Sequence, residues 1–423
     1  MGVQLKPVGE QVMVITGADS GIGLATAKLA AKRGACLVLN SRNEAELARI
    51  AAELIRGGAK VEWHAGDVAE MQTHMELAEV AIRAFGRIDT WINNAGVSIY
   101  GMIEDVPLDD ARRMFETNYW GVVNGSLAAL PYLKANGGAL INVGSIVSDT
   151  FIPLQGHYSA SKHAVKGFTD ALRVELEHQN APVQVTLVKP GAIDTPFPQH
   201  AANYMDAEPR HPHPVYVPEV VARAIVHCAA NPRRSVTVGG GGRMMAMVGE
   251  AAPRVADAMN QGMFRQQKRS RPSSIPQEET LWAPPTRTGR ARGEQPGYVM
   301  RHSAYTAASL HPVRTGLALA AVAVGWAVAN GMTDGLVRRG RDLVDNVRGR
   351  GGDRVDDADV EVEIHGRPRY AEQPYATPRA TQPAYAAQPL SADYAEPAPE
   401  VTVEVTREVY VMDVPTVGDR YVP

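Results

Sequence analysis

The stretch QVMVITGADSGIG, from Gln11 to Gly23, decides the fold. It begins as a largely apolar run typical of a buried strand, and Thr16–Gly23 then forms a glycine-rich turn that opens into a segment of helical period. Glycines let a backbone turn sharply and approach a phosphate closely at the N-terminus of a helix. Taken alone, this turn is either a nucleotide-binding loop or an ordinary tight turn.

A second motif lies in GHYSASK, where Tyr158 and Lys162 stand four residues apart. Side chains at i and i+4 share one face of a helix, and Ser145 lies upstream in NVGSIVS. A tyrosine with an ordinary pKa of about 10 is a poor base at neutral pH. A cation one helical turn away would stabilise its phenolate and lower that pKa. Together with the glycine-rich turn, these residues predict a cofactor site and a proton-transfer site on one sheet.

Short apolar runs alternate with helix-period segments through the first half of the chain. This alternation predicts an α/β fold, a Rossmann-like doubly wound parallel sheet with helices on both faces. The glycine turn, NNAG at Asn93–Gly96, Ser145 and Pro190-Gly191 each follow a predicted strand, so they should meet at the carboxyl edge of the sheet. The predicted strands are Val12–Thr16, Ala35–Asn40, Lys60–Ala65, Thr90–Asn93, Ala139–Val143, Val183–Lys189 and Ser235–Val238. The predicted helices are Gly21–Arg33, Asn43–Arg56, Met71–Phe85, Leu108–Leu133, Tyr158–Gln179 and Pro218–Ala230.

These motifs, in this order, resemble the short-chain dehydrogenase/reductase family in its ordinary-length branch. The resemblance covers residues 8–250 and rests on TGADSGIG, Gly66-Asp67-Val68, NNAG, Asn118 in FETNYWG, Ser145, YSASK, and Pro190-Gly191 followed by Thr195. It implies an oxidoreductase that acts on CH–OH groups with NAD(P), and a homo-oligomer. It says nothing about the rest of the chain.

By this resemblance, Tyr158 is the general acid/base, Lys162 binds the nicotinamide ribose and Ser145 hydrogen-bonds the substrate oxygen. Asn118 would hold a proton-relay water near the lysine. Asp67 is similar to the residue that bonds the adenine amino group, although a solvated turn carboxylate is the alternative. No metal site is expected. The implied cofactor-binding residues are Gly17, Ser20, Gly21, Ile22, Gly23, Ser41, Arg42, Asp67, Val68, Asn94, Ala95, Gly96, Tyr158, Lys162, Pro190, Gly191 and Thr195.

The end of the second predicted strand bears on the choice of dinucleotide. Sites that prefer NAD place an Asp or Glu there for the ribose 2′-hydroxyl, while an Arg accommodates a 2′-phosphate. This chain has Ser41 and Arg42 at that point and no carboxylate, and a guanidinium pairs bidentately with phosphate. We therefore predict NADP(H). NAD(H) is the alternative if Arg42 is only a surface residue that opens the next helix.

The substrate side is expected to be apolar. Phe151–Gln155 lies between Ser145 and Tyr158, where the family lines its substrate cleft, and Pro196–Pro218 is placed as a mobile lid. We expect an enzyme that interconverts a small hydrophobic ketone or aldehyde and its alcohol by hydride transfer, with no nucleic-acid partner. The alternative is a dinucleotide-binding, membrane-associated scaffold whose catalysis is incidental.

The composition changes after residue 264, where we place the end of the catalytic domain. The 265–310 segment is rich in Pro and Arg and is predicted to be a linker. Within 311–350, the run Gly316–Met332 is almost continuously apolar and flanked by basic residues. It could span a membrane, lie at its surface or pack on protein. The acidic, Pro/Tyr-rich 351–423 segment is expected to be mostly disordered. No apolar segment precedes the first predicted strand, so we expect a cytoplasmic protein, with membrane attachment open.

Overall fold

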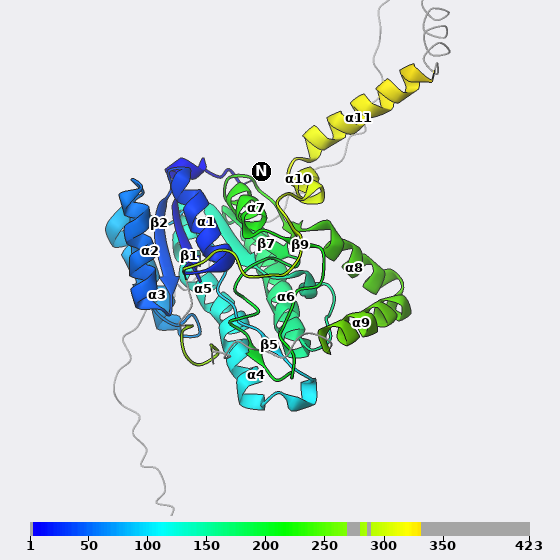
Figure 1. The fold of residues 1–423 in the computed structure, drawn as a ribbon. Helices are drawn as coiled ribbons and strands as arrows, with labels where there is room; N and C mark the ends of the chain where they lie inside the picture. The colour runs from blue at the N-terminus through cyan, green and yellow to red at the C-terminus, as the bar shows by residue number, and fades with distance from the viewer. Residues whose placement is uncertain (1–2, 269–279, 286–288, 331–423) are drawn as a thin grey trace, which may run out of the picture. The chain divides into compact units, whose positions relative to one another are not determined.

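The computed structural model describes residues 3–268, 280–285 and 289–330 (Figure 1). Its main sheet has seven parallel strands in the order β10-β7-β6-β4-β1-β2-β3. The order reverses between β1 and β4, and a parallel sheet binds its ligand beyond the carboxyl ends of the strands at that point. The strands are β1 (Val12–Thr16), β2 (Cys36–Ser41), β3 (Val61–Ala65), β4 (Thr90–Asn93), β6 (Gly138–Val143), β7 (Val183–Pro190) and β10 (Ser235–Val238).

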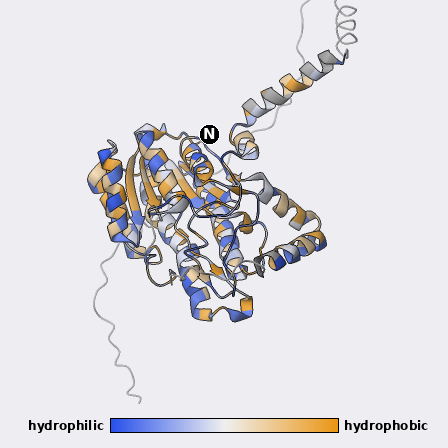
Figure 2. Ribbon diagram, viewed as in Figure 1, coloured by the Kyte–Doolittle hydropathy of each residue, from blue (hydrophilic) through white to orange (hydrophobic). Residues whose placement is uncertain are grey.

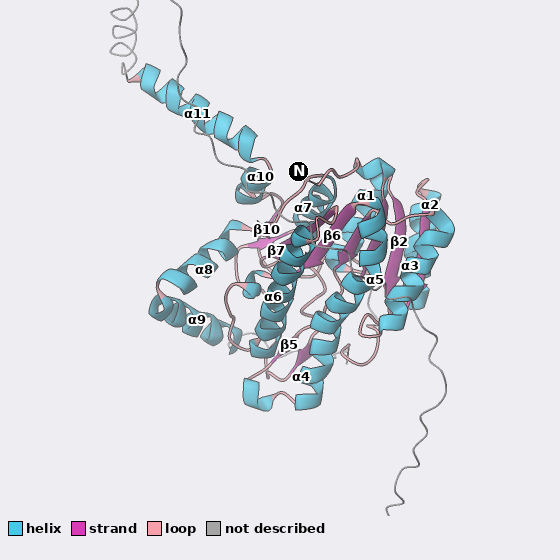
Figure 3. Ribbon diagram, turned by 180° about the vertical axis from the view of Figure 1, so that it is seen from behind, coloured by secondary structure: helices cyan, strands magenta, loops and turns pink. Residues whose placement is uncertain are grey.

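Helices cover both faces of this sheet (Figures 1 and 3). In β1, Met13 and Ile15 point into one apolar cluster, and Val12 and Val14 point into the other, as the two-residue period of a strand requires. Figure 2 shows apolar colour along the strands and a mixture of apolar and polar colour on the helices. The first face is covered by α1 (Gly21–Lys32), α2 (Glu44–Arg56) and α7 (Pro218–Ala230). The second is covered by α3 (Met71–Phe85), α5 (Gly121–Asn136) and α6 (Gly156–His178).

The predicted Rossmann-like α/β sheet is confirmed, with one difference in a helix. The predicted helix Leu108–Leu133 is divided into α4 (Leu108–Phe115), a π-helical turn over Glu116–Trp120, and α5. The turn contains Asn118, which is fully buried. Short π-helical turns occur frequently at functional sites because they redirect side chains and backbone groups.

The chain after β10 adds further elements. They are α8 (Gly240–Ala251), α9 (Pro253–Lys268), β11 (Val299–Met300), α10 (Ala304–Leu310) and α11 (Pro312–Ala329). β11 pairs with β9 (Val215–Tyr216), and β5 (Ile99–Tyr100) pairs with β8 (Ala202–Asn203). Part of the predicted linker thus contacts the fold, and the domain division at residue 264 stays a prediction.

The predicted apolar run Gly316–Met332 falls on α11 as far as Ala329. None of the helices in the described ranges has both the length and the apolar character needed to cross a membrane. The end of that run and the predicted acidic tail lie outside the described residues.

Candidate active site

The glycine-rich turn between β1 and α1 has the close backbone geometry that a pyrophosphate needs. Gly17 and Gly21 have φ angles of 62° and 52°, which glycine adopts without strain. A Cβ on Gly23 would lie 1.9 Å from the carbonyl oxygen of Gly17, so only glycine fits. From the end of β4, Asn94 Nδ2 donates to the carbonyls of Thr16 and Gly17 at 2.9 and 3.1 Å. The turn therefore fits the predicted dinucleotide.

The first turn of α1 faces the same cavity. Amides in a first helical turn have no partner within their own helix, and the helix dipole favours an anion there. The Gly21 amide donates to the carbonyl of Arg290 at 3.0 Å. Ile22, the next residue, lines the cavity, and pyrophosphate binding by its amide stays a prediction.

The residues after β2 and β3 form the end of the cavity that is predicted to hold the adenosine. Ser41, Arg42, Asp67 and Val68 all line the cavity there. Arg42 Nη1 lies 3.9 Å from Asp67 Oδ2. Burial lowers the pKa of Arg42, and the Asp67 carboxylate opposes this change. The guanidinium nevertheless stays charged, because arginine does not lose its proton in proteins.

Sequence reasoning missed Arg113, on α4. Its Nη2 donates to Asp67 Oδ2, and its Nε donates to the carbonyl of Leu281 at 3.0 Å. The other Asp67 oxygen accepts the amide of Ala69 at 3.0 Å. Asp67 is thus an ion-paired turn carboxylate, and its adenine contact stays a prediction. No local pattern marks Arg113, since it lies 46 residues from Asp67 in the chain.

Ser145 and Tyr158 meet at the end of β6. Ser145 begins a 3₁₀ turn, and its Oγ accepts the amide of Val147 at 3.3 Å. Tyr158 on α6 is 9% exposed. Burial raises the pKa of Tyr158 to about 12, and a hydrogen bond with Ser145 opposes the rise. Desolvation therefore dominates the pKa of this phenol, and the lowering of that pKa by Lys162 stays a prediction.

Lys162 lies one turn further along α6 and is buried. Its Nζ donates to the carbonyl of Val143 at 3.1 Å and lies 5.8 Å from the centroid of the Tyr158 ring. Burial lowers the pKa of Lys162 to about 8. The ammonium is therefore beside the tyrosine, as the four-residue spacing predicts, and it retains its charge at neutral pH.

Asn118 lies behind the cavity wall. Its Oδ1 accepts the Val97 amide at 2.8 Å, and its Nδ2 donates to the Val97 carbonyl at 2.9 Å. A Cβ on Gly96 would meet Asn118 Oδ1 at 3.3 Å and Lys162 Nζ at 3.6 Å. The side chain thus fixes the backbone after NNAG close to the lysine, and the relay water stays a prediction.

One cavity of about 530 Å³ joins these groups. Among the predicted site residues, only Gly23 and Asn118 do not line it. Those that do are Gly17, Ser20, Gly21, Ile22, Ser41, Arg42, Asp67, Val68, Asn94, Ala95, Gly96, Ser145, Tyr158, Lys162, Pro190, Gly191 and Thr195. The predicted roles of the individual residues stay predictions, but the fold does bring these residues together.

The substrate end of the cavity is mainly apolar. Of the predicted segment Phe151–Gln155, Ile152 and Gln155 line the cavity, whereas Phe151, Pro153 and Leu154 do not. From the predicted lid, the Phe197 ring lies 5.7 Å from the Tyr158 ring. Four methionines on α8 and α9 also line this end, and sequence reasoning missed them because they follow the last strand of the sheet. They are Met244, Met245, Met259 and Met263.

A Rossmann-like sheet with a glycine turn and a buried Ser–Tyr–Lys group beside it defines a dinucleotide-dependent oxidoreductase. The short chain dehydrogenase family model matches residues 11–205. The uncharacterized oxidoreductase YxnA of Bacillus subtilis is 42% identical over 331 residues, which cover 77% of this chain and 92% of the relative. The chain therefore belongs to the short-chain dehydrogenase family and is an oxidoreductase that uses a nicotinamide dinucleotide. The match to YxnA is longer than the predicted catalytic domain, so it includes residues beyond 264.

Two further comparisons agree with this assignment. The 11-beta-hydroxysteroid dehydrogenase A of Sesamum indicum is 35% identical over 244 residues, or 55% of this chain and 69% of the relative. A short chain dehydrogenase/reductase of Burkholderia phymatum, solved in complex with NAD, matches with a TM-score of 0.53 at 24% identity. That match covers 64% of this chain and 100% of the solved chain, and it supports the fold.

Proposed function

We propose that this protein is an NADP(H)-dependent oxidoreductase that interconverts a hydrophobic ketone or aldehyde and its alcohol. The observation that carries the proposal is that Ser145 and Tyr158 line the same cavity as the glycine turn. Lys162 lies buried beside this pair on the same helix. A proton donor, a group that orients an oxygen and a fixed cation are what carbonyl reduction requires of a protein.

The chemistry divides between the cofactor and the chain. When bound, the dinucleotide supplies or accepts the hydride. Ser145 orients the substrate oxygen, and Tyr158 gives its proton to the alkoxide that develops on that oxygen. The Lys162 ammonium stabilises the phenolate that remains. Burial raises the pKa of Tyr158 to about 12, so the phenol carries the proton that carbonyl reduction requires at neutral pH.

Arg42 supports the choice of NADP(H). It stands at the end of β2, and its side chain is 18% exposed at the cavity wall. No carboxylate occupies the corresponding place in Leu39–Arg42 to bind a free ribose 2′-hydroxyl. A guanidinium in that position pairs with a phosphate through charge-assisted hydrogen bonds.

The walls of the cavity support a hydrophobic substrate. Methionine side chains are flexible and polarizable, so they adapt to bulky apolar molecules. Ile152 and Phe197 add apolar surface beside Tyr158. The relative in Sesamum indicum is called a hydroxysteroid dehydrogenase, and a polycyclic alcohol is one molecule of the proposed kind.

A panel of hydrophobic ketones, aldehydes and alcohols tests the proposal. The absorbance of the reduced dinucleotide is followed with the full chain and with either NADPH or NADH. We expect turnover with NADPH on apolar carbonyls and weaker turnover with NADH. Tight dinucleotide binding without turnover on any member would support the scaffold alternative.

Two proposals concern the rest of the molecule. We propose that α11 associates with a membrane, because Leu317, Val322 and Trp326 on this helix are 67%, 70% and 61% exposed. We also propose that the chain forms a homo-oligomer, as the family resemblance implies. Light scattering on the purified chain tests this proposal.

A further inference from the structure

A segment that follows α9 in the chain lies across the predicted dinucleotide site. We call residues 280–285 and 289–303 the strap. Thr280 and Pro285 line the cavity. The Gly289 amide donates to the Asp19 carbonyl at 2.9 Å. The carbonyl of Arg290, also in the strap, accepts the Gly21 amide. The strap therefore contacts the glycine turn that is predicted to hold the pyrophosphate.

The strap is fixed at its other end by backbone pairing and close packing. β11 pairs with β9, and the Val217 amide donates to the Met300 carbonyl at 3.0 Å. The Gly293 amide donates to the Asp194 carbonyl at 3.2 Å. A Cβ on Gly293 would lie 2.4 Å from the carbonyl oxygen of Thr195. This part of the strap thus packs directly on the loop that lines the nicotinamide side of the cavity.

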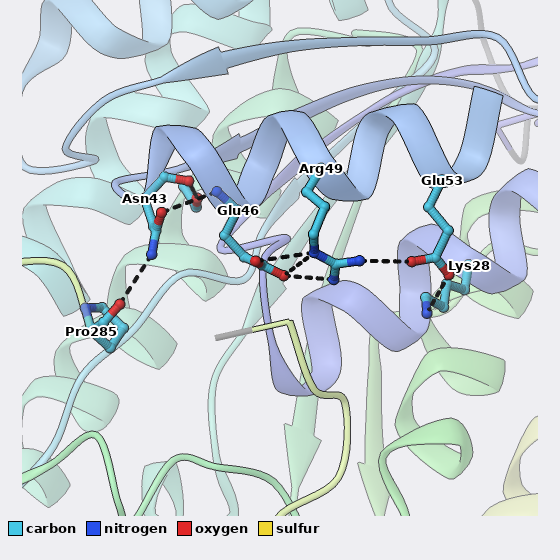
Figure 4. Close-up of polar contacts among 7 residues, drawn as sticks. Lys28, Asn43, Glu46, Arg49, Glu53 and Pro285 are labelled. Carbon is cyan, nitrogen blue, oxygen red and sulfur yellow. Dashed lines mark hydrogen bonds and ion pairs between the residues drawn. The ribbon is translucent and has the colours of Figure 1, made fainter. Parts of the chain in front are cut away.

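At the adenosine end, the strap holds the guanidinium of Arg42. Arg42 Nη1 donates to the Leu281 carbonyl at 3.0 Å, and Nη2 donates to the Thr280 carbonyl. The next residue, Asn43, donates from Nδ2 to the Pro285 carbonyl at 3.1 Å (Figure 4). A guanidinium has five N–H donors, so these two carbonyls fix its orientation and leave donors for a ligand.

Asp67 pairs with Arg42 only at long range, with a nearest contact of 3.9 Å, because its hydrogen bond goes to Arg113. Trp282 of the strap packs over Arg113, 5.7 Å from the ring centroid to Cζ, and its Nε1 donates to Asp110 at 2.7 Å. The strap therefore contacts both guanidinium groups. It holds Arg42 by two carbonyls, and it holds Arg113 by one carbonyl and the ring of Trp282.

We propose that the strap positions Arg42 for the 2′-phosphate of NADP(H) and so determines the choice between the two dinucleotides. This inference rests on the proposed function, in which Arg42 binds that phosphate. An arginine held in its binding orientation loses less conformational freedom when the phosphate arrives. NADH has no 2′-phosphate, so its affinity does not depend on this orientation. Trp282 is accordingly a positioning residue. It packs on Arg113, and Arg113 donates to the same Leu281 carbonyl that binds Arg42.

The test is a Trp282→Ala substitution in the full chain. Trp282 is 59% exposed, so its removal should loosen the strap without opening the core. NADPH and NADH affinities are measured by calorimetric titration, and thermal unfolding checks the fold. We expect NADPH affinity to fall about tenfold, which is the scale of one charge-assisted contact. NADH affinity should change by less than about twofold. Tyr298→Ala is the matched control, because Tyr298 lies on the same strap and is 78% exposed; it should change neither affinity.

Each other outcome overturns a defined part of the reasoning. Equal losses for both dinucleotides, or no loss for either, would refute selection by the strap. If Arg42→Ala removes the preference for NADPH while Trp282→Ala keeps it, the strap inference alone fails. If Arg42→Ala keeps the preference, Arg42 does not bind the 2′-phosphate and the premise of the inference fails. A wild-type chain without a preference for NADPH would refute the proposed choice of cofactor. Should Trp282→Ala not fold, Thr280→Val replaces it, because this change removes the hydroxyl that bonds the His200 carbonyl and keeps the Thr280 carbonyl.

Discussion

Replacing Tyr158 with phenylalanine removes one hydroxyl and little else. The ring keeps its place 5.7 Å from the ring of Phe197 in a buried position. Ser145 loses its bond to the phenol but retains the Val147 amide as a partner. The substitution therefore isolates proton transfer from packing.

The expected magnitudes differ strongly between turnover and stability. Losing a general acid costs about 10²- to 10⁴-fold in rate, which corresponds to about 2.7–5.4 kcal/mol in the activation barrier. Losing one ordinary hydrogen bond costs about 1 kcal/mol of unfolding free energy. Turnover should thus collapse while the protein stays folded and still binds its dinucleotide.

The assay is kcat with NADPH and the best carbonyl of the panel, together with a dinucleotide titration and a thermal unfolding curve. Tyr100→Phe is the matched control, since Tyr100 is also buried and lines the same cavity. It should leave kcat within a small factor of the wild type. A Tyr158→Phe enzyme that retains more than about a tenth of the wild-type kcat would refute the assignment of the general acid.

Four further predictions follow from the same site and from α11. Arg42→Ala should lower NADPH affinity by about one to two orders of magnitude and leave NADH affinity nearly unchanged, since a charge-assisted contact contributes about 1.5–3 kcal/mol; equal losses in titrations would show that Arg42 does not select phosphate. Lys162→Ala should weaken turnover and dinucleotide binding together, because one buried ammonium serves both; unchanged affinity would remove its ribose role. Because burial raises the pKa of Tyr158 to about 12, alcohol oxidation should rise about tenfold from about pH 6 to 7, below the Lys162 pKa of about 8, while carbonyl reduction stays flat; initial rates in both directions check this, and a flat oxidation profile would contradict it. The full chain should float with anionic vesicles and be released by high salt, whereas a chain that ends at Leu310 should not float; equal flotation of both would exclude α11 as the attachment.

Local chemistry explains why much of the fold could be predicted. Val12–Ile15 is a short, continuously apolar run, as a strand buried on both faces requires, and its side chains are divided between two clusters. The glycines of the next turn mark positions where a Cβ cannot fit. Tyr158 and Lys162 meet because four residues make about one helical turn. Each of these statements depends only on residues that are near one another in the chain.

The pKa of Tyr158 could not be predicted without knowing how the side chain is packed. The sequence placed a cation beside Tyr158 and suggested a lowered pKa, but burial raises that pKa to about 12. Desolvation depends on every element that covers the phenol, including Phe197 from the predicted lid. A sequence motif does not show how deeply these elements together bury the phenol.

The sequence by itself determined the sheet, the glycine turn and the Tyr–Lys pair, because short-range periodicity and residue type fix them. Only the tertiary structure decided what surrounds Arg42. Its guanidinium bonds the backbone carbonyls of Thr280 and Leu281, 238 and 239 residues away, and a carbonyl carries no side-chain signature. The Pro- and Arg-rich composition of that segment predicted a linker, whereas packing lays its described part across the cofactor site. Long-range backbone contacts of this kind arise from the whole fold, and composition does not record them.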